Sequence, residues 1–234
     1  MTEILIVAAT VEEAQFLLRK KREPLPGKAW PLDWIKGPMH FDLLITGPGI
    51  TFTAWHLAKA LSMKRYDLAI NIGIAGSSDP AIQPVRVVQV RTDRFADWGA
   101  ENEKGAIIDG FGLGFLSPNK KPFKAGVLQA TFKGKLSCLK AIPSVAGITV
   151  NTATGTEKRK RMLVDQYGEG IESMEGAAFL YGCAMEGIPA LQIRSVSNKT
   201  GKRNRKAWKV REAIDALEGF VGLMIMELSS QKQK

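Results

Sequence analysis

Residues 3–13 read Glu-Ile-Leu-Ile-Val-Ala-Ala-Thr-Val-Glu-Glu, and this stretch decides the class of fold. Its continuous apolar run, which ends at Ala9, is typical of a parallel strand that is buried on both faces. Thr10, with Glu13 three positions later, forms a capping-box pattern that predicts the start of a helix. The stretch therefore predicts a buried strand that passes directly into a helix, with two carboxylates at the junction.

The same alternation of strand and helix continues along the chain. We expect further strands at 41–46, 67–72, 85–90, 126–130, 147–151, 171–174 and 190–196, and helices that end near Arg22 or span 51–64, 157–167, 175–186 and 206–228. Residues 99–122 are Gly-rich and irregular, which predicts a surface excursion over a site. This order predicts a single α/β domain over residues 1–234, with a central mixed, mostly parallel β-sheet flanked by helices on both faces.

Composition narrows the class of protein. A chain of 234 residues suits one domain with a full core. No apolar run approaches the roughly 20 residues of a membrane helix, and the start lacks the basic region of a signal peptide. The two cysteines, Cys138 and Cys183, favour a reducing compartment. We therefore expect a cytoplasmic protein with no membrane partner. With two histidines and two cysteines at no ligand spacing, we also expect no metal site.

The net charge of +10 raises the question of an anionic partner. Positive residues gather at 19–22, 158–161 and 199–209, and the first two groups read as solvated helix surfaces. A nucleic-acid-binding protein would show a steep dependence of affinity on salt. Because the sequence holds no recognised nucleic-acid motif, we expect no nucleic-acid partner.

Ligands of such sheets bind beyond the carboxyl ends of the strands, so the residues at those ends matter most. An acid such as Glu175, set between a strand and an apolar helix, is costly to bury without a function. Glu13 could cap its helix and also act in a site, and Arg194 could be the structural partner of a buried acid. Glu172 is interpreted as a strand-end surface acid. Gly73 to Gly76 are interpreted as a Gly-rich turn after a strand. The remaining candidates at strand ends are Gly47 to Gly49, Asn151 to Gly155 and Ser197-Asn198.

Taken in order, Met174-Glu175-Gly-Ala-Ala178 and Arg194-Ser-Val-Ser197-Asn198 resemble the nucleoside phosphorylase and nucleosidase superfamily, over nearly the whole chain. The resemblance implies that Glu175 accepts hydrogen bonds from the ribose hydroxyls, with Met174 under the sugar. It implies that Glu13 holds the attacking water and that Asn198 faces N7 and the 6-substituent of a purine. Ala75 and Gly76 would line the base and sugar pocket through their backbone.

The chemistry agrees with these roles, because glycosidic cleavage passes through an oxocarbenium-like sugar. Glu13 can deprotonate water, and Asn198 can donate to the departing base. The carboxylates of Glu12 and Glu13 would repel phosphate, which favours a hydrolase over a phosphorylase. An amide at Asn198 favours a 6-oxopurine such as hypoxanthine, although a flipped amide could also accept from an amino group.

Within this superfamily, Ser197-Asn198 followed by Arg203-Asn-Arg205 resembles the futalosine hydrolases. Arg203 or Arg205 would pair with a carboxylate on the 5′ side of the substrate, unless both belong to a basic surface loop. The resemblance implies cleavage of futalosine to hypoxanthine and dehypoxanthine futalosine in menaquinone biosynthesis. It implies no cofactor, a small-molecule nucleoside substrate and a homo-oligomer, a dimer or larger. Alternatives are a methylthioadenosine/S-adenosylhomocysteine nucleosidase, a purine nucleoside phosphorylase and a nucleoside-binding module without activity.

Overall fold

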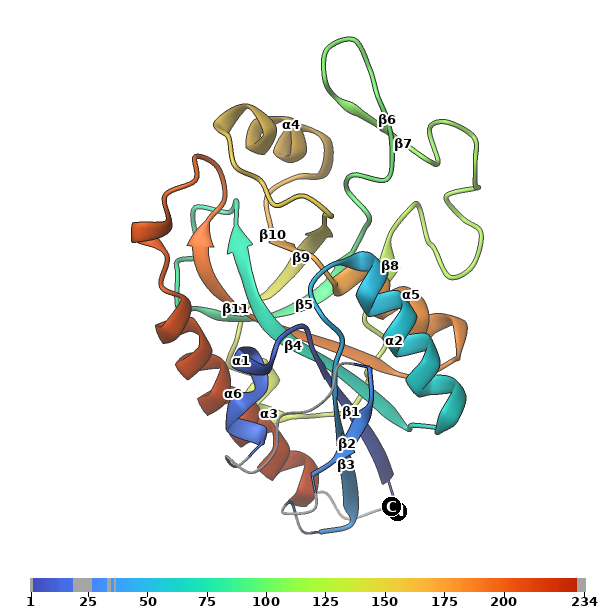
Figure 1. Ribbon diagram of the computed structural model, residues 1–234, viewed down its shortest axis with the longest axis vertical. Helices are drawn as coiled ribbons and strands as arrows, with labels where there is room; N and C mark the ends of the chain where they lie inside the picture. Colours follow the sequence, from blue (N-terminus) through green and yellow to red (C-terminus); the bar gives the residue numbers. More distant parts are fainter. Residues whose placement is uncertain (1, 19–26, 33–34, 36, 231–234) are drawn as a thin grey trace.

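A computed structural model describes residues 2–18, 27–32, 35 and 37–230 (Figure 1). Nine strands form one mixed sheet in the order β10-β9-β5-β11-β4-β1-β3-β2, with β8 paired to β5. Their bounds are β1 Thr2–Ala8, β2 Ala29–Pro31, β3 Met39–Ile45, β4 Leu68–Ser77, β5 Val87–Asp93, β8 Leu128–Gln129, β9 Ser144–Thr149, β10 Ile171–Ser173 and β11 Ala190–Lys199. Strand β10 also pairs with β4, so five strands close into a ring beside the flatter part of the sheet, a closure that the sequence did not predict.

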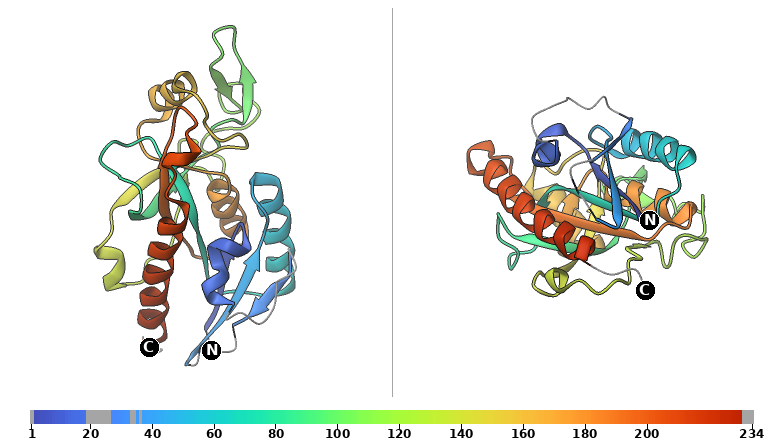
Figure 2. Two further views of the ribbon diagram at one scale, coloured as in Figure 1. Left: turned by 60° about the vertical axis from the view of Figure 1, so that its left-hand side comes forward. Right: turned by 90° about the horizontal axis from the view of Figure 1, so that it is seen from below.

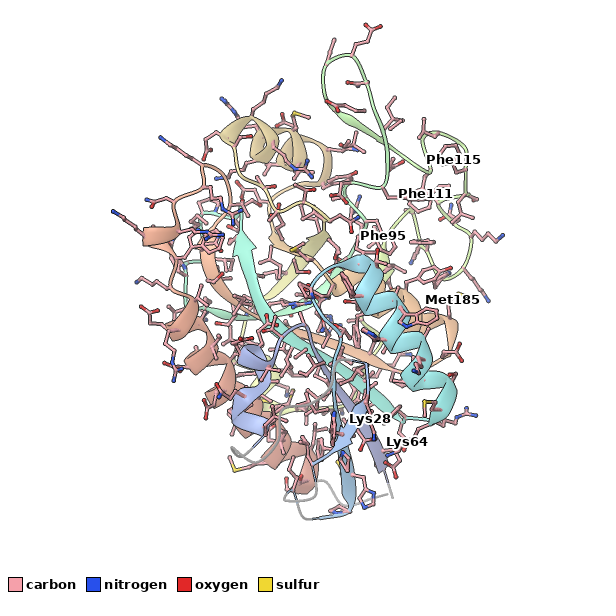
Figure 3. The ribbon with its side chains drawn as sticks, in the orientation of Figure 1. Lys28, Lys64, Phe95, Phe111, Phe115 and Met185 are labelled. Carbon is pink, nitrogen blue, oxygen red and sulfur yellow. The ribbon has the colours of Figure 1, made fainter. Side chains whose placement is uncertain are left out.

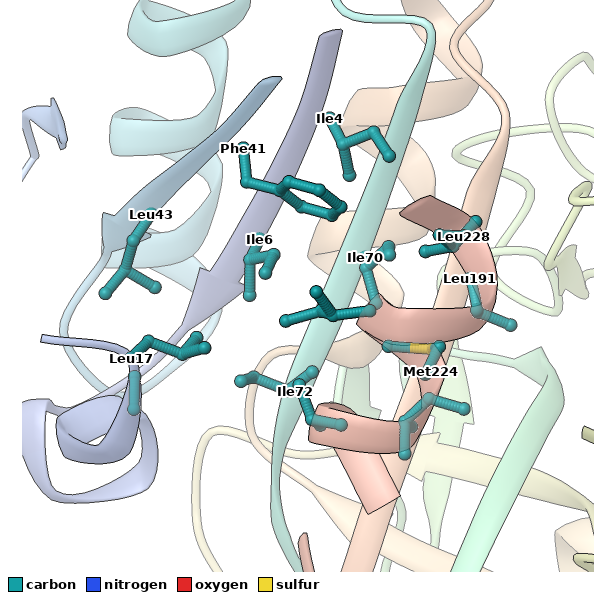
Figure 4. Close-up of a cluster of buried hydrophobic side chains, with 14 of the residues drawn as sticks. Ile4, Ile6, Leu17, Phe41, Leu43, Ile70, Ile72, Leu191, Met224 and Leu228 are labelled. Carbon is teal, nitrogen blue, oxygen red and sulfur yellow. The ribbon is translucent and has the colours of Figure 1, made fainter. Parts of the chain in front are cut away.

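Helices cover both faces of the sheet, as predicted. On one face α2 (Ile50–Met63) packs against α5 (Gly176–Met185), and on the other lies α6 (Val210–Ser230) with the short α1 (Val11–Ala14) (Figure 2). Alternate residues of a strand point to opposite faces. In β1, Ile4 and Ile6 therefore join the core under α6, whereas Leu5 and Val7 join the core under α2 and α5 (Figure 4). A single strand thus supplies two cores.

The helices outside the central sheet agree only in part with the bounds predicted from the sequence. Helix α4 spans Glu157–Tyr167 as predicted, and Thr156 caps it. The first helix is shorter than predicted, because α1 passes into a 3-10 helix at Gln15–Leu17, and residues 19–22 lie outside the described part of the chain. The last helix begins at Val210 rather than 206, after a separate 3-10 turn at Arg205–Ala207. Short α3 (Ser137–Lys140) was not predicted.

Residues 99–122 form the expected excursion. It carries a hairpin of β6 (Gly99–Glu101) and β7 (Ile107–Asp109), which projects beyond the sheet on the same side as α4 (Figure 1). In the described part of the chain, no helix has the length and apolar character needed to cross a membrane.

Two adjacent strands run further than predicted, and this sets the position of the site. Gly73 to Gly76 was interpreted as a turn, but it continues β4 to Ser77. Strand β11 lies parallel to it as far as Lys199, with a bulge between Val196 and Asn198. Asn198 therefore lies within a strand, opposite Gly76, rather than in a loop. The backbone hydrogen bonds of the neighbouring strand hold this glycine-rich stretch extended.

Candidate active site

The junction of β1 and α1 places Glu13 inside the molecule. The hydroxyl of Thr10 accepts from the Glu13 backbone N–H (3.3 Å), and Glu13 Oε2 accepts from the Thr10 N–H (3.2 Å), which completes the predicted capping box. The second oxygen, Oε1, accepts from the N–H of Ile74 in β4 (2.8 Å). Glu13 is 7% exposed, whereas Glu12 points to solvent. Helix capping and a place in the site therefore coexist at Glu13.

Glu175 lies between β10 and α5 and is 5% exposed. Its Oε1 accepts from the backbone N–H of Gly49 (3.0 Å), which joins the turn before α2 to the start of α5. Gly49 has a φ of 101°, in the region that favours glycine, and this conformation belongs to the turn that presents its N–H to Glu175. The predicted burial of this acid is confirmed.

Arg194 in β11 is fully buried and connects the two acids. Its Nη1 lies 3.5 Å from Glu175 Oε2, and within the described part of the chain it has no hydrogen-bond acceptor. A Cβ at Gly73 would strike both this nitrogen and Glu13 Oε1, so the missing side chain leaves room for the guanidinium and the Glu13 carboxylate. Arg194 is thus a partner of buried acids, and it also faces the space between them.

The electrostatics follow from two carboxylates sharing one cation away from water. Burial raises the pKa of the Glu13 carboxyl above its ordinary value of 4.5, and nearby Glu175 raises it further. Arg194 and the N–H groups of Ile74 and Thr10 act in the opposite direction on that pKa. A carboxylate with a raised pKa takes up a proton more readily, which suits a general base.

Asn198 is half-buried and lies opposite Gly76, with Ala75 one position earlier in β4. Its Nδ2 donates to the Lys199 carbonyl (2.9 Å), and its Oδ1 accepts from the Ser197 hydroxyl (2.8 Å). A Cβ at Gly76 would lie 3.4 Å from Nδ2, so this glycine keeps space beside the amide. These contacts orient the amide and leave a second Nδ2 hydrogen for a ligand.

The basic segment after Asn198 divides into parts with different roles. Lys199 Nζ donates to the carbonyls of Asp79 (2.7 Å) and Ile82 (2.8 Å), so it fixes the loop after β4. Arg203 and Arg205 are exposed, and the Arg203 guanidinium lies 5.3 Å from the ring centre of Trp208. The Arg203 N–H donates to the Gly155 carbonyl (3.2 Å). Arg203 therefore borders the 151–155 loop, and both arginines lie at the surface, outside the buried cluster of Glu13, Glu175 and Arg194.

The 151–155 loop is fixed by an acid that we misinterpreted. Glu172 was expected at the surface, but it is 9% exposed and accepts from both the N–H (2.8 Å) and the hydroxyl of Thr154. Burial raises the pKa of Glu172, while the hydrogen bonds from Thr154 lower it. All three residues of β10 are buried, and the two hydrogen bonds from Thr154 place Glu172 under the loop. Met174, half-buried, follows between β10 and α5.

A cavity of about 500 Å³ opens beside the start of α2. Ile50, which follows the glycine bound to Glu175, lines it together with Phe95, Asp97, Trp98, Gly99, Leu116, Phe123, Asn151 and Tyr181. Figure 3 shows Phe95, Phe111 and Phe115 along this side of the molecule, with Met185 of α5 nearby. Four of the nine residues that line the cavity are aromatic, and Ile50, next to Gly49, is the link between the cavity and Glu175. Among the described residues, no group of three His, Cys, Asp or Glu side chains could hold a metal ion.

Known proteins resemble this chain in sequence and in fold. A model of the phosphorylase superfamily matches residues 3–225. The futalosine hydrolase of Streptomyces coelicolor is 32% identical over 83% of each chain, and that of Thermus thermophilus is 28% identical over 95% of each chain. The methylthioadenosine/S-adenosylhomocysteine nucleosidase of Helicobacter pylori has a similar fold, with a TM-score of 0.77, 16% identity, and coverage of 97% of this chain and 99% of its own.

Proposed function

Because this chain belongs to the phosphorylase superfamily, we propose that it hydrolyses the N-glycosidic bond of a purine nucleoside and that its substrate is futalosine. One observation carries the proposal: the buried cluster of Glu13, Glu175 and Arg194 beside the half-buried amide of Asn198. The relatives from S. coelicolor and T. thermophilus are futalosine hydrolases and match most of the chain. This combination supports hydrolysis and names the substrate to test first.

In this reaction Glu13 accepts a proton from water as the water oxygen attacks C1′ of the ribose. The bond from C1′ to the purine nitrogen breaks, and its electron pair leaves with the base. Glu175 accepts hydrogen bonds from the ribose hydroxyls, with Met174 against the sugar. Arg194 Nη1, which faces Glu175, offers hydrogen-bond donors to the water or the sugar. Negative charge near C1′ stabilises the positive charge that develops on the ribose.

The charge balance of the cluster favours water over phosphate as the nucleophile. Glu13 and Glu175 place two carboxylates beside the single guanidinium of Arg194, at 0–7% exposure. A phosphate dianion would meet two negative groups where water screens little of the repulsion. We therefore expect base release without phosphate.

Asn198 accounts for the choice of a 6-oxopurine. Its free Nδ2 hydrogen can donate to N7 or O6 as negative charge moves onto the leaving hypoxanthine. Ala75 and Gly76 line the same pocket through the backbone. Arg203 or Arg205 binds the carboxylate on the 5′ side of futalosine. The products are hypoxanthine and dehypoxanthine futalosine, a step of menaquinone biosynthesis in the cytoplasm.

A methylthioadenosine/S-adenosylhomocysteine nucleosidase is the second candidate. The observation that favours it is the aromatic cavity beside Ile50, which fits an apolar 5′ substituent. A nucleosidase of that name from Buchnera aphidicola is 24% identical over 83% of this chain. The two candidates differ in the released base, hypoxanthine or adenine.

We also propose that the protein forms a homo-oligomer through the faces of α2 and α5. Exposed large apolar side chains gather there: Phe52, Trp55 and Met63 on α2, and Tyr181 and Met185 on α5, at 37–78% exposure. Tyr181 also lines the cavity, so a second copy would cover both the apolar surface and the open side of the cavity.

Trp55→Glu should shift the protein to the monomer in analytical ultracentrifugation, and an unchanged mass would contradict this interface.

The activity is tested by incubating the protein with futalosine, inosine and methylthioadenosine without phosphate and following base release by chromatography. Hypoxanthine from futalosine, at a far higher rate than from inosine, is the expected result. Adenine from methylthioadenosine would favour the second candidate. Base release only after phosphate is added would overturn the assignment as a hydrolase.

A further inference from the structure

A row of buried polar side chains crosses the sheet on one side of the acid cluster. It runs from Thr149 in β9 through Asp93 in β5 to Gln192 and Arg194 in β11 and ends at Asn71 in β4. Each of the five is at most 1% exposed. Of these residues, only Arg194 has a part in the reaction described above, so the other four need an explanation.

The hydrogen bonds along the row have a fixed direction. Asp93 Oδ1 accepts from the Arg94 N–H (2.8 Å) and the Thr149 hydroxyl (2.9 Å), and Oδ2 accepts from Gln192 Nε2 (3.1 Å). An ionised carboxylate can only accept, so the amide of Gln192 must turn its nitrogen toward Asp93. This leaves Gln192 Oε1 to accept from Arg194 Nε (3.2 Å). Asp93 thereby fixes which end of the amide meets the arginine.

Asn71 provides the second fixed acceptor. Its Nδ2 donates to the Val7 carbonyl (3.0 Å), which leaves Oδ1 to accept from Arg194 Nη2. With Nε and Nη2 both bound, Arg194 has one nitrogen left, Nη1, and it faces Glu175. The guanidinium cannot rotate without breaking both bonds.

The start of α5 rests on the same row. A Cβ at Gly176 would collide with Asp93 Oδ2 and with the amide of Gln192. The Ala177 N–H donates to the Thr149 hydroxyl (2.7 Å), which itself donates to Asp93. Because Glu175 directly precedes Gly176, the row fixes the positions of both Arg194 and Glu175.

We infer that Asp93 and Gln192 are positioning residues for hydrolysis: Asp93 orients the Gln192 amide, and that amide holds Arg194 Nη1 between Glu13 and Glu175. The inference rests on the proposed function for its effect on rate. A displacement of about 1 Å in such a group lowers the rate roughly 100-fold. Burial raises the pKa of Asp93 and the bonds from Gln192 and Thr149 lower it. The resulting pKa is about 6, so Asp93 is ionised at pH 8.

The test exchanges the polarity of the two side chains without changing their size. In Asp93→Asn, the new amide must point its hydrogens at either Gln192 Nε2 or the Arg94 N–H, and both are donors. In Gln192→Glu, two carboxylates face each other. The double variant Asp93→Asn, Gln192→Glu restores a donor facing an acceptor, keeps one negative charge, and again offers an acceptor to Arg194 Nε.

At pH 8 we expect each single variant to lose ~10- to 100-fold in kcat, with KM within about threefold, and the double variant to recover to within about fivefold of wild type. Asp42→Asn, which removes another buried carboxylate, 7% exposed and far from Arg194, is the control and should keep wild-type kcat. A fully active Asp93→Asn variant, or a double variant no better than either single one, would overturn the inference.

Crystal structures of the three variants separate this inference from the proposed function. The Arg194 guanidinium should be displaced in each single variant and return to its wild-type position in the double variant. This readout needs no substrate. If wild-type protein releases no base from any nucleoside, the proposed function fails, while the position of Arg194 still decides whether the row orients it.

Discussion

Two clusters of charged side chains lie at opposite ends of the sheet, and each contains two carboxylates and one cation. At the amino ends of the strands, Lys64 Nζ lies 2.8 Å from Asp42 and 2.7 Å from Glu3, and the Tyr66 hydroxyl donates to Asp42 (2.7 Å). At the carboxyl ends, Arg194 faces Glu13 and Glu175. The composition is the same, but exposure differs: the side chains of Lys64 and Glu3 are 38% and 27% exposed, whereas Arg194 is fully buried.

The difference in exposure separates a structural cluster from a candidate catalytic one. Water reaches the lysine and one acid of the first cluster, so their charges are screened and each pair contributes little to stability. In the second cluster the protein replaces water, the pKa of Glu13 rises, and one nitrogen of Arg194 faces the space between the acids. Perturbed, water-excluded charges of this kind concentrate at functional sites.

The largest expected effect tests the acid cluster itself. Glu13→Gln removes the group that takes the proton from water, so we expect kcat for hypoxanthine release to fall ~100- to 10,000-fold. Wild-type kcat/KM should also fall as the pH drops through the pKa of Glu13, which lies above 4.5, because protonation removes the base. In Glu13→Gln this acid limb should disappear. A pH-rate profile measured from pH 4 to 9 checks both points. If kcat/KM of Glu13→Gln still falls at low pH as in the wild type, the titrating group is not Glu13.

A smaller effect is expected at the base end of the site. Asn198→Asp replaces the donating amide with a carboxylate that would repel O6 of hypoxanthine. We expect kcat/KM for futalosine to fall ~10- to 100-fold, while adenine release from methylthioadenosine rises or stays constant. Parallel assays on the two substrates measure the ratio. Equal losses on both would show that Asn198 supports the fold of the pocket without choosing the base.

Stability should depend on pH through Asp93. Its folded pKa of about 6 lies above the ordinary 3.8, so the folded state binds more protons than the unfolded state between these values. The free energy of unfolding therefore falls as pH rises through this window, by up to ~3 kcal/mol. Urea unfolding of wild type and Asp93→Asn at pH 4 and 7 should show the wild type losing stability relative to the variant. If the free energy of unfolding changes equally with pH in wild type and in Asp93→Asn, the raised pKa of Asp93 is contradicted.

The smallest effect is expected at the amino-terminal cluster. Asp42→Asn weakens the bonds with Lys64 and Tyr66, which should lower the free energy of unfolding by ~1–2 kcal/mol. Base release should stay within about twofold of wild type, since the cluster lies at the far end of the sheet. Chemical unfolding and the chromatographic assay measure the two quantities on one preparation. A large loss of activity at unchanged stability would contradict a purely structural role for the cluster of Asp42, Glu3 and Lys64.

The parts of this architecture that depend on local sequence were predictable. The capping box of Thr10 and Glu13 and helix α4 are where the sequence predicted them, and the expected superfamily is confirmed. Glu175 is buried as its apolar surroundings required. Capping is predictable because it depends on neighbours within a few residues, and the apolar segments on either side of Glu175 are of the kind that fills a core.

The parts that depend on strand pairing were not predictable. Gly73 to Gly76 looked like a turn and is a strand, because β11 supplies its hydrogen-bond partners over a long sequence separation. Glu172 looked exposed, and only the position of Thr154 gives it a partner. Asn71, Asp93 and Gln192 carried no motif of their own. Their shared row follows from the register of β4, β5 and β11, which no single segment encodes.

The central claim is that the cluster of Glu13, Glu175 and Arg194 directs water to the glycosidic bond. The most direct measurement gives wild-type protein futalosine with and without saturating phosphate and identifies the sugar product by 31P NMR and mass spectrometry. We predict free dehypoxanthine futalosine at the same rate in both reactions and almost none from Glu13→Gln. A sugar 1-phosphate, or full activity of Glu13→Gln, would contradict the account.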